Sequence, residues 1–224
     1  MTKELLIEGL KCVCVSEAYT SKVVYMIYPS VVPFTDEWLK EMSVKYGFSL
    51  VMVYVPASKW NDMLTPWPEP GETPDSPPFG GQSAMTLELL RDKVVPQTEK
   101  ILGLTNVASR NLAGVSLSGL FTLWQWIQCD LFDSVASLSG SFWYNGFIDW
   151  FENRSIPKKD GKAYFLLGNK EPKSWIKAYR SVGENTEKIV SRLQSSGIPT
   201  TFQWVPGDHF ADPLGRAESA LSHL

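Results

Sequence analysis

The sequence predicts an α/β fold in which a mostly parallel central sheet carries helices on both faces. Apolar, β-branched runs alternate with stretches of helical periodicity, and the second half of the chain keeps a regular strand–helix order. No long insertion separates the core strands, so we expect no large cap domain. A chain of 224 residues suits a single α/β domain that spans residues 1–224.

The first half of the chain alternates strands with one well-capped helix. We expect strands near Lys11–Val15, Lys22–Tyr28 and Ser49–Val55, the last an uninterrupted apolar run that is typical of a central strand. Between the last two strands, Thr35 is placed to cap a helix that Gly47 ends.

The segment from about 56 to 83 is the least regular part of the sequence. It is rich in proline and contains Trp60, Trp67 and Phe79. The interleaved aromatic side chains favour a packed, functional loop over a disordered linker. We therefore expect an irregular Pro/Trp-rich loop in which Trp60 and Trp67 contact the substrate.

The rest of the chain reads as alternating helices and strands. A helix over 84–102 is expected to kink or break early at Pro96. The later elements are strands at Asn111–Val115, Ser134–Leu138, Lys162–Leu167 and Thr200–Val205, and helices over 117–129, 174–196 and 213–224.

The composition argues against partners other than a small molecule. A net charge of −3 without a clustered basic stripe offers no surface that would follow a phosphate backbone, so we expect no nucleic-acid partner. No apolar run reaches the roughly 18 residues that span a bilayer. Charged residues interrupt the start of the chain, so we expect neither a signal peptide nor a membrane partner.

The cysteines and histidines predict a cytoplasmic location and no metal site. Cys12, Cys14 and Cys129 form no pattern that predicts disulfide bonds, and an odd number suggests free thiols in a reducing compartment. The only histidines are His209 and His223, too few for a structural zinc site. We expect no metal and no cofactor, and the sequence leaves a homo-oligomer open.

The window AGVSLSGL around Ser116 comes close to Gly-x-Ser-x-Gly, the sequence of a nucleophile elbow. Such an elbow needs small residues two positions to either side of the serine, because larger side chains would collide with the adjoining strand or helix. Gly114 and Ser118 meet this need around Ser116. Ser118 and Ser139 lack flanking glycines and are weaker candidates. An ordinary strand-to-helix turn with a capping serine is the alternative.

A serine hydroxyl needs a base to remove its proton. His209, in PGDHF, follows the last predicted strand, where it can face the serine. His223 is the penultimate residue of a terminal helix and is expected to be solvated. An acid that orients the imidazole should follow the strand before the last, and Glu171 is the one carboxylate in that loop, GNKE. Asp212 is the second candidate for the acid.

An oxyanion hole would combine two backbone N–H groups. One is that of Leu117, at the N-terminus of the helix that follows Ser116. The other should come from the loop after Lys22–Tyr28. Pro29 has no N–H group, so Ser30 or Val31 is the expected second donor.

These residues resemble those of bacterial α/β-hydrolases in the esterase family that includes enterochelin-esterase-like and esterase-D-like enzymes. The resemblance rests on AGVSLSGLF, FLLGNKE and WVPGDHFADPLGR, in that order, and extends to KWNDMLTPWPEP and FGGQ. Two features depart from the family: Tyr28-Pro29 stands where many members have His-Gly, and Ser118 replaces the usual small apolar residue or glycine.

The resemblance implies an α/β-hydrolase fold and a serine esterase that needs no cofactor. It implies Ser116 as the nucleophile and His209 as the general base, while some siderophore esterases of this group use a serine–histidine pair without an acid such as Glu171. We expect a carboxylesterase-type hydrolase that cleaves an ester or thioester of small to medium size through an acyl-enzyme. The alternatives are a non-catalytic ligand-binding module on a hydrolase scaffold and an acyltransferase.

Overall fold

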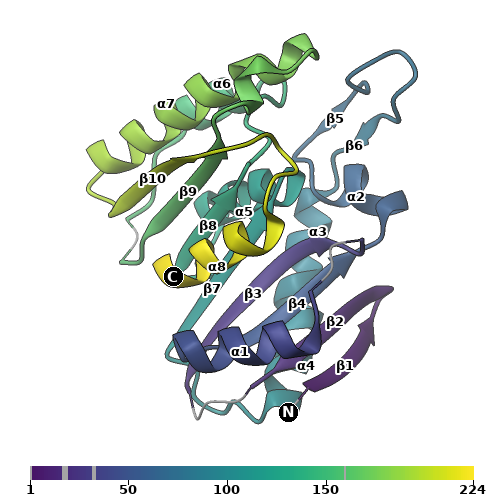
Figure 1. The fold of residues 1–224 in the computed structure, drawn as a ribbon, viewed down its shortest axis with the longest axis vertical. Helices are drawn as coiled ribbons and strands as arrows, with labels where there is room; N and C mark the ends of the chain where they lie inside the picture. Colours follow the sequence, from purple (N-terminus) through teal and green to yellow (C-terminus); the bar gives the residue numbers. More distant parts are fainter. Residues whose placement is uncertain (1, 17–19, 32–33, 159) are drawn as a thin grey trace.

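An eight-stranded sheet runs through the computed structural model, which describes residues 2–16, 20–31, 34–158 and 160–224. The strand order is β1-β2-β4-β3-β7-β8-β9-β10 (Figure 1). β2 pairs antiparallel with β1 and β4, whereas the other neighbouring strands pair in parallel. The strands are β1 (Thr2–Ile7), β2 (Leu10–Val15), β3 (Lys22–Pro29), β4 (Ser49–Val55), β7 (Ser109–Val115), β8 (Ser134–Leu138), β9 (Ala163–Gly168) and β10 (Thr200–Val205). The predicted mostly parallel sheet is confirmed.

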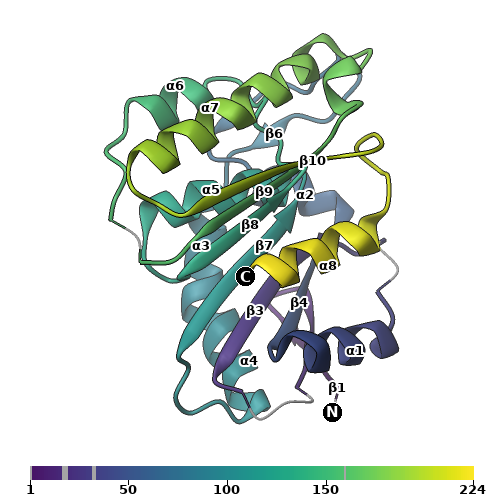
Figure 2. The same cartoon turned by 60° about the vertical axis from the view of Figure 1, so that its left-hand side comes forward.

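Helices cover both faces of this sheet (Figure 2). α1 and α8 pack on one face through apolar side chains that include Leu39, Met42 and Leu221. α5 lies against the other face, with buried residues along its whole length except for the last. The helices are α1 (Asp36–Tyr46), α2 (Ala57–Met63), α3 (Ser83–Leu89), α4 (Val95–Leu102), α5 (Leu117–Gln128), α6 (Phe147–Glu152), α7 (Val182–Ser195) and α8 (Pro213–His223).

Local sequence signals place the ends of several elements correctly. Thr35 caps α1, because its hydroxyl accepts a hydrogen bond from the Trp38 N–H at 3.2 Å. Gly47 ends the same helix with a φ of 69°, a conformation that glycine adopts without a steric penalty. β4 is buried along its entire length, as expected of a central strand.

The predicted helix over 84–102 is interrupted. A π-helical turn, Leu90–Val94, separates α3 from α4, and Pro96 falls in the first turn of α4. Proline has no N–H group, so it is tolerated where the first turn of a helix leaves N–H groups unpaired anyway. The interruption predicted at Pro96 therefore lies just before it, at the π-helical turn.

Two other predictions about elements need correction. The 56–83 segment is not wholly irregular, because it contains α2 and a short hairpin of β5 (Pro68–Glu69) and β6 (Phe79–Gly80). The helix predicted from 174 begins only at Val182, after a 3-10 turn. Tyr179 in that turn donates a hydrogen bond to Glu72 at 3.0 Å and stacks near Trp143, so contacts with distant segments outweigh local helix propensity.

The sequence prediction also missed α6 and the edge strand β1. In β1, buried and exposed side chains do not alternate clearly, and Leu6 is 78% exposed. Among the described residues, no helix has both the length and the apolar character needed to cross a membrane.

Candidate active site

Ser116 lies in a strained turn between β7 and α5. Its φ of 59° and ψ of −125° are unusual for a residue with a side chain. The Ser116 N–H donates to Leu138 O at 3.0 Å, and the Ser116 carbonyl accepts from the N–H of Ser141 at 3.1 Å. These bonds tie the turn to the end of β8. The side chain is thereby presented at the carboxyl edge of the sheet, which is the geometry of a nucleophile elbow.

The two small residues that flank Ser116 fit the turn for different reasons. A Cβ atom at Gly114 would overlap the backbone of Ser118, so only glycine fits there. Ser118 is fully buried, and its Oγ donates to Ile27 O at 2.7 Å and accepts from the Val115 N–H at 2.8 Å. The hydroxyl therefore anchors the elbow to β3 as well as being small enough for it.

The glycine that comes one residue late, Gly119, serves helix packing. A Cβ atom at this position would lie 2.8 Å from Ser137 Oγ and 2.9 Å from Gly140 Cα. Both distances are shorter than ordinary van der Waals contact, so any side chain would push α5 away from β8. Gly119 is required by the approach of α5 to the sheet.

Glu171 follows β9, and its side chain is buried. Oε1 accepts hydrogen bonds from Ser139 Oγ at 2.6 Å and from the Gly168 N–H at 2.8 Å. Oε2 lies 2.8 Å from His209 Nδ1. Burial raises the pKa of the Glu171 carboxyl, but the hydrogen bond and charge of His209, with the donors on Oε1, bring the pKa below its ordinary value. The carboxylate is ionised at neutral pH and can stabilise an imidazolium.

His209 lies in the loop between β10 and α8, with 32% of its side chain exposed. Since an ionised Glu171 only accepts hydrogen bonds, it selects the tautomer with the proton on Nδ1 and leaves Nε2 basic. Within the described residues, the hydroxyl of Ser116 lies 3.4 Å from Ser141 Oγ, and no hydrogen bond joins it to the imidazole. Unliganded sites often hold such a looser arrangement, which tightens when substrate binds.

The other polar residues considered from the sequence have local roles. Asp212 caps α8, because its carboxylate accepts from the Gly215 N–H at 3.0 Å. The neighbouring Asp208 accepts a backbone N–H of its own loop. His223 stacks on Tyr164, with ring centroids 3.9 Å apart. Among the carboxylates weighed from the sequence, the structure therefore places Glu171 beside the imidazole.

Ser116 and His209 line the same pocket, which has a volume of about 440 Å³. Of the other predicted site residues, Val31 and Trp60 also line it. The pocket lies at the edge of the sheet where the parallel strands end, the usual position of a site in such folds. Its lining consists of Tyr28, Pro29, Val31, Ala57, Trp60, Asn61, Val115, Ser116, His209, Phe210, Ala211, Pro213 and Arg216.

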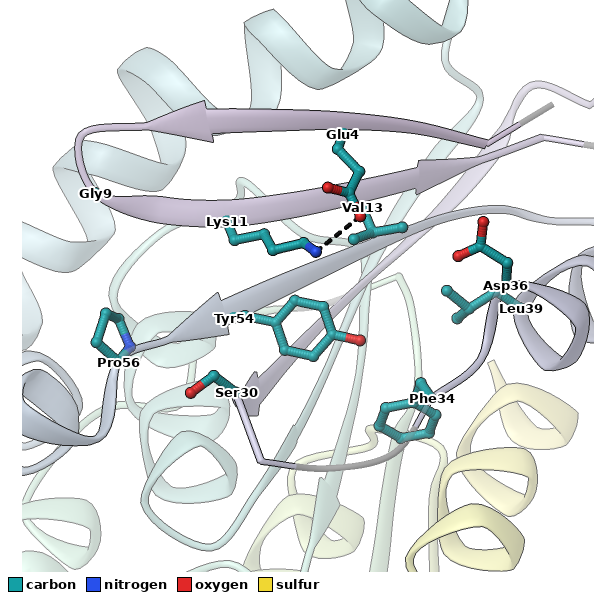
Figure 3. Close-up of a pocket in the computed structure, with 10 residues that line it drawn as sticks. All are labelled: Glu4, Gly9, Lys11, Val13, Ser30, Phe34, Asp36, Leu39, Tyr54 and Pro56. Carbon is teal, nitrogen blue, oxygen red and sulfur yellow. Dashed lines mark ion pairs between the residues drawn. The ribbon is translucent and has the colours of Figure 1, made fainter.

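Ser30 and Trp67 do not line the Ser116 pocket. Ser30 lines a second hollow of about 320 Å³, near the ion pair of Lys11 and Glu4 (Figure 3). Trp67 is absent from the lining of the Ser116 pocket. Its indole N–H donates to Asn145 O at 3.0 Å, and its ring packs near Tyr144, Phe147 and Trp150. Trp67 thus joins the Pro/Trp-rich segment to the region around α6.

Sequence reasoning missed several residues of the site. Ser139 was weighed only as a rival nucleophile, yet its hydroxyl donates to Glu171. Phe210, beside His209, is 86% exposed at the pocket. Arg216 is buried behind the histidine loop and lies 3.4 Å from Glu171. An arginine in the first turn of the helix after the histidine was the available signal for Arg216.

No protein-family model matches the sequence. Among curated proteins, the chain is 23% identical over 151 residues to a Bacillus subtilis (strain 168) protein, the uncharacterized protein YbbA. The match covers 66% of this chain and 60% of YbbA, so it spans less than two thirds of that relative.

Solved structures show the same fold. The siderophore hydrolase EstB from Aspergillus nidulans matches with a TM-score of 0.72 and 18% identity, over 99% of this chain and 93% of EstB. The enterobactin and salmochelin hydrolase IroE matches with a TM-score of 0.73 and 20% identity, over 99% and 92% of the two chains. IroE in complex with DFP is also similar, with a TM-score of 0.70, 20% identity and the same coverage. The chain therefore has the α/β-hydrolase fold that the resemblance predicted.

Within the described residues, no group of three or more histidine, cysteine, aspartate or glutamate side chains is arranged to hold a metal ion. Cys12 and Cys14 are buried in β2, where burial raises the pKa of each thiol to about 12.

Proposed function

We propose that the protein is a serine hydrolase that cleaves carboxylic esters of small to medium size through an acyl-enzyme. The observation that carries the proposal is the pairing of a strained Ser116 with His209 in one pocket, while an ionised Glu171 holds the imidazole from behind. The likeness in fold to EstB, IroE and the IroE complex with DFP supports the same chemistry.

In the proposed reaction, Ser116 Oγ turns from Ser141 and attacks the ester carbonyl carbon as its proton passes to His209 Nε2. The resulting imidazolium is stabilised by Glu171 and then protonates the departing alcohol. Water, deprotonated by the same imidazole, attacks the acyl-enzyme carbonyl. The imidazolium then returns the proton to Ser116 Oγ as the bond to the serine breaks and the acid is released. In each half of the reaction, His209 gives back the proton that it accepts. No group changes oxidation state, so no oxidant or reductant is needed.

The negative charge on the carbonyl oxygen needs two donors. We assign one to the Leu117 N–H, at the N-terminus of α5, where the helix dipole also favours negative charge. For the other, the N–H of Val31 is favoured over that of Ser30, because Val31 lines the Ser116 pocket and Ser30 lines the second hollow.

The pocket lining favours an uncharged acyl or aryl group. Its walls include Trp60, Phe210 and Pro29, and the positive side chain in its described lining, Arg216, is buried and hydrogen-bonded. EstB and IroE are named as siderophore hydrolases, and an ester of that class is the second candidate substrate for this chain. A thioester fits the same chemistry. We propose a cytoplasmic location, as the cysteine usage suggests.

Covalent labelling by a fluorophosphonate probe, together with hydrolysis of p-nitrophenyl butyrate, tests the proposal. Ser116→Ala should abolish labelling, and Ser116→Ala and His209→Ala should each lower kcat by about 10⁴-fold or more. Matched controls are Ser195→Ala, on the exposed side of α7, and His223→Ala, at the end of α8; both should keep wild-type labelling and turnover.

The same assays separate the alternatives. A wild-type protein that neither labels nor hydrolyses the ester would contradict the proposal, and ligand binding that persists in Ser116→Ala would then favour a binding module. An acyltransferase would label normally but transfer the butyryl group to an added alcohol in preference to water. Product analysis by mass spectrometry distinguishes the transferred ester from the free acid.

A further inference from the structure

Arg216, in the first turn of α8, is buried with only 5% of its surface exposed, and it joins three loops of the site. Its Nη2 donates to Asp208 O at 2.6 Å, and its Nη1 lies 3.3 Å from His209 O, so it holds two consecutive carbonyls of the histidine loop. Nη1 also donates to Ser139 Oγ at 2.6 Å, and that hydroxyl donates to Glu171 Oε1. One guanidinium therefore connects the loops that follow β8, β9 and β10.

The loop that carries His209 has little packing of its own. Its Phe210 is 86% exposed, and Asp208 is also exposed. A backbone hydrogen bond from the Lys170 N–H to Gly207 O, at 3.0 Å, ties the start of the loop to the glutamate loop. Beyond that point, the contacts of Arg216 with the two carbonyls hold the backbone of the loop, while Glu171 Oε2 holds the imidazole.

Arg216 makes these contacts without occupying the oxygen that the imidazole uses. Its nearest approach to Glu171 is the 3.4 Å between Nη1 and Oε1, whereas Oε2 is left to His209 Nδ1. The planar fork of a guanidinium can serve several acceptors in fixed directions at once. A lysine ammonium is a single point of charge on a flexible chain and cannot replace this set of contacts.

We propose that Arg216 is a positioning residue for the ester hydrolysis: it fixes the His209 loop and the Glu171 carboxylate relative to Ser116. The inference rests on the proposed function, since it concerns the same site. Arg216 acts through His209 and Glu171, so its loss should lower kcat and leave KM nearly unchanged. A displacement of reacting groups by about 1 Å can lower the rate by roughly 100-fold.

The experiment compares Arg216→Lys and Arg216→Ala with the wild type in p-nitrophenyl butyrate hydrolysis. For Arg216→Lys we expect kcat to fall by about 10- to 100-fold, with KM within about twofold of the wild type. In Arg216→Ala the loss should be larger, and guanidinium ion added at a concentration below that which unfolds the protein should restore part of it. A purely structural defect would not respond to guanidinium in this way.

The matched control is Arg110→Lys and Arg110→Ala, at an arginine whose guanidinium pairs with Glu99 at the start of β7. These variants should keep wild-type kcat and show no guanidinium rescue. Wild-type kcat in Arg216→Lys, or a rise in KM without a fall in kcat, would overturn the inference. If Arg216→Ala does not fold, Arg216→Lys decides alone. An inactive wild type would instead count against the proposed function.

Discussion

Two arginine–glutamate pairs in this protein use their carboxylates differently. At the start of β7, Arg110 meets both oxygens of Glu99, with Nε to Oε1 at 2.6 Å and Nη2 to Oε2 at 3.0 Å. At the other edge of the sheet, Arg216 approaches one oxygen of Glu171 at 3.4 Å, and His209 takes the other oxygen at 2.8 Å. The first carboxylate is held at both oxygens by its arginine, whereas the second divides its oxygens between an arginine and a histidine.

The difference separates a structural ion pair from one built into a candidate active site. A bidentate pair fixes the geometry of both partners, and in the Arg110–Glu99 pair neither carboxylate oxygen is left to an imidazole. Because Arg216 spreads its donors over Ser139 and two backbone carbonyls, it leaves Oε2 of Glu171 to the imidazole of His209. The same substitution should therefore lower mainly the activity at Glu171 and mainly the stability at Glu99.

The largest contrast is expected from the same isosteric change at each carboxylate. Glu171→Gln should lower kcat by about 10³- to 10⁴-fold, because an amide no longer fixes the Nδ1–H tautomer of His209 or stabilises its imidazolium. Glu99→Gln should keep the wild-type kcat and lower the free energy of unfolding by about 1 kcal/mol, since Arg110 is partly exposed. Ester hydrolysis and urea unfolding measure the two effects.

The comparison would fail if Glu171→Gln kept turnover within about tenfold of the wild type. The site would then work as a serine–histidine pair, as the resemblance to some siderophore esterases allows. A loss of kcat in folded Glu99→Gln would show that the two ends of the sheet are coupled.

A smaller contrast is expected at the hydroxyl that donates to each carboxylate. Ser139 donates to Glu171 at 2.6 Å, and Tyr25 donates to Glu99 at 3.3 Å. Ser139→Ala should lower kcat by about 10-fold through the loss of one charge-assisted hydrogen bond of roughly 1.5 kcal/mol. Tyr25→Phe should leave kcat unchanged and destabilise the fold by about 1 kcal/mol.

Because Ser139 has a φ of 48°, alanine at this position keeps the backbone strain. Ser139→Gly removes both the strain and the hydroxyl, so it serves as the control. Equal losses of kcat in the two variants would assign the effect to the hydroxyl. Normal kcat in Ser139→Gly would instead assign it to the backbone.

The smallest effect is expected in the dependence of stability on pH. The native pKa of Glu171 lies below its ordinary value of 4.5, so its ionised form stabilises the fold above about that pH. This contribution is lost as the pH falls through the native pKa, because the unfolded chain binds the proton first. The unfolding free energy should therefore fall more steeply below pH 4.5 in the wild type than in Glu171→Gln. Parallel pH profiles would contradict the expectation.

How much could be predicted from the sequence depended on whether the signal was local. Thr35 and Gly47 mark the two ends of α1 through a capping hydroxyl and a left-handed backbone conformation. The apolar run of β4 predicts a buried strand. The elbow around Ser116 and the loop position of His209 are local too, and the structure brings both residues to one pocket.

The predictions that failed depended on contacts between distant segments. Tyr179 leaves its expected helix because it meets Glu72 and Trp143. Trp67 packs near α6 instead of lining the Ser116 pocket. The role of Arg216 depends on three separate loops, and no pattern within one stretch of sequence shows that these meet.

The positive φ angles around the site have a consequence for the balance between stability and function. Four non-glycine residues with positive φ occur among the described residues: Glu8, Ser116, Ser139 and Asp212. Three of them surround the candidate site, and each such residue holds strain of about 1 kcal/mol that glycine would release. A protein that needed only a binding scaffold could relieve this backbone strain with glycine at Ser116 and Ser139. Selection for the hydroxyl groups would therefore preserve the serines at 116 and 139. Selection for stability alone would instead favour a less strained backbone at these positions.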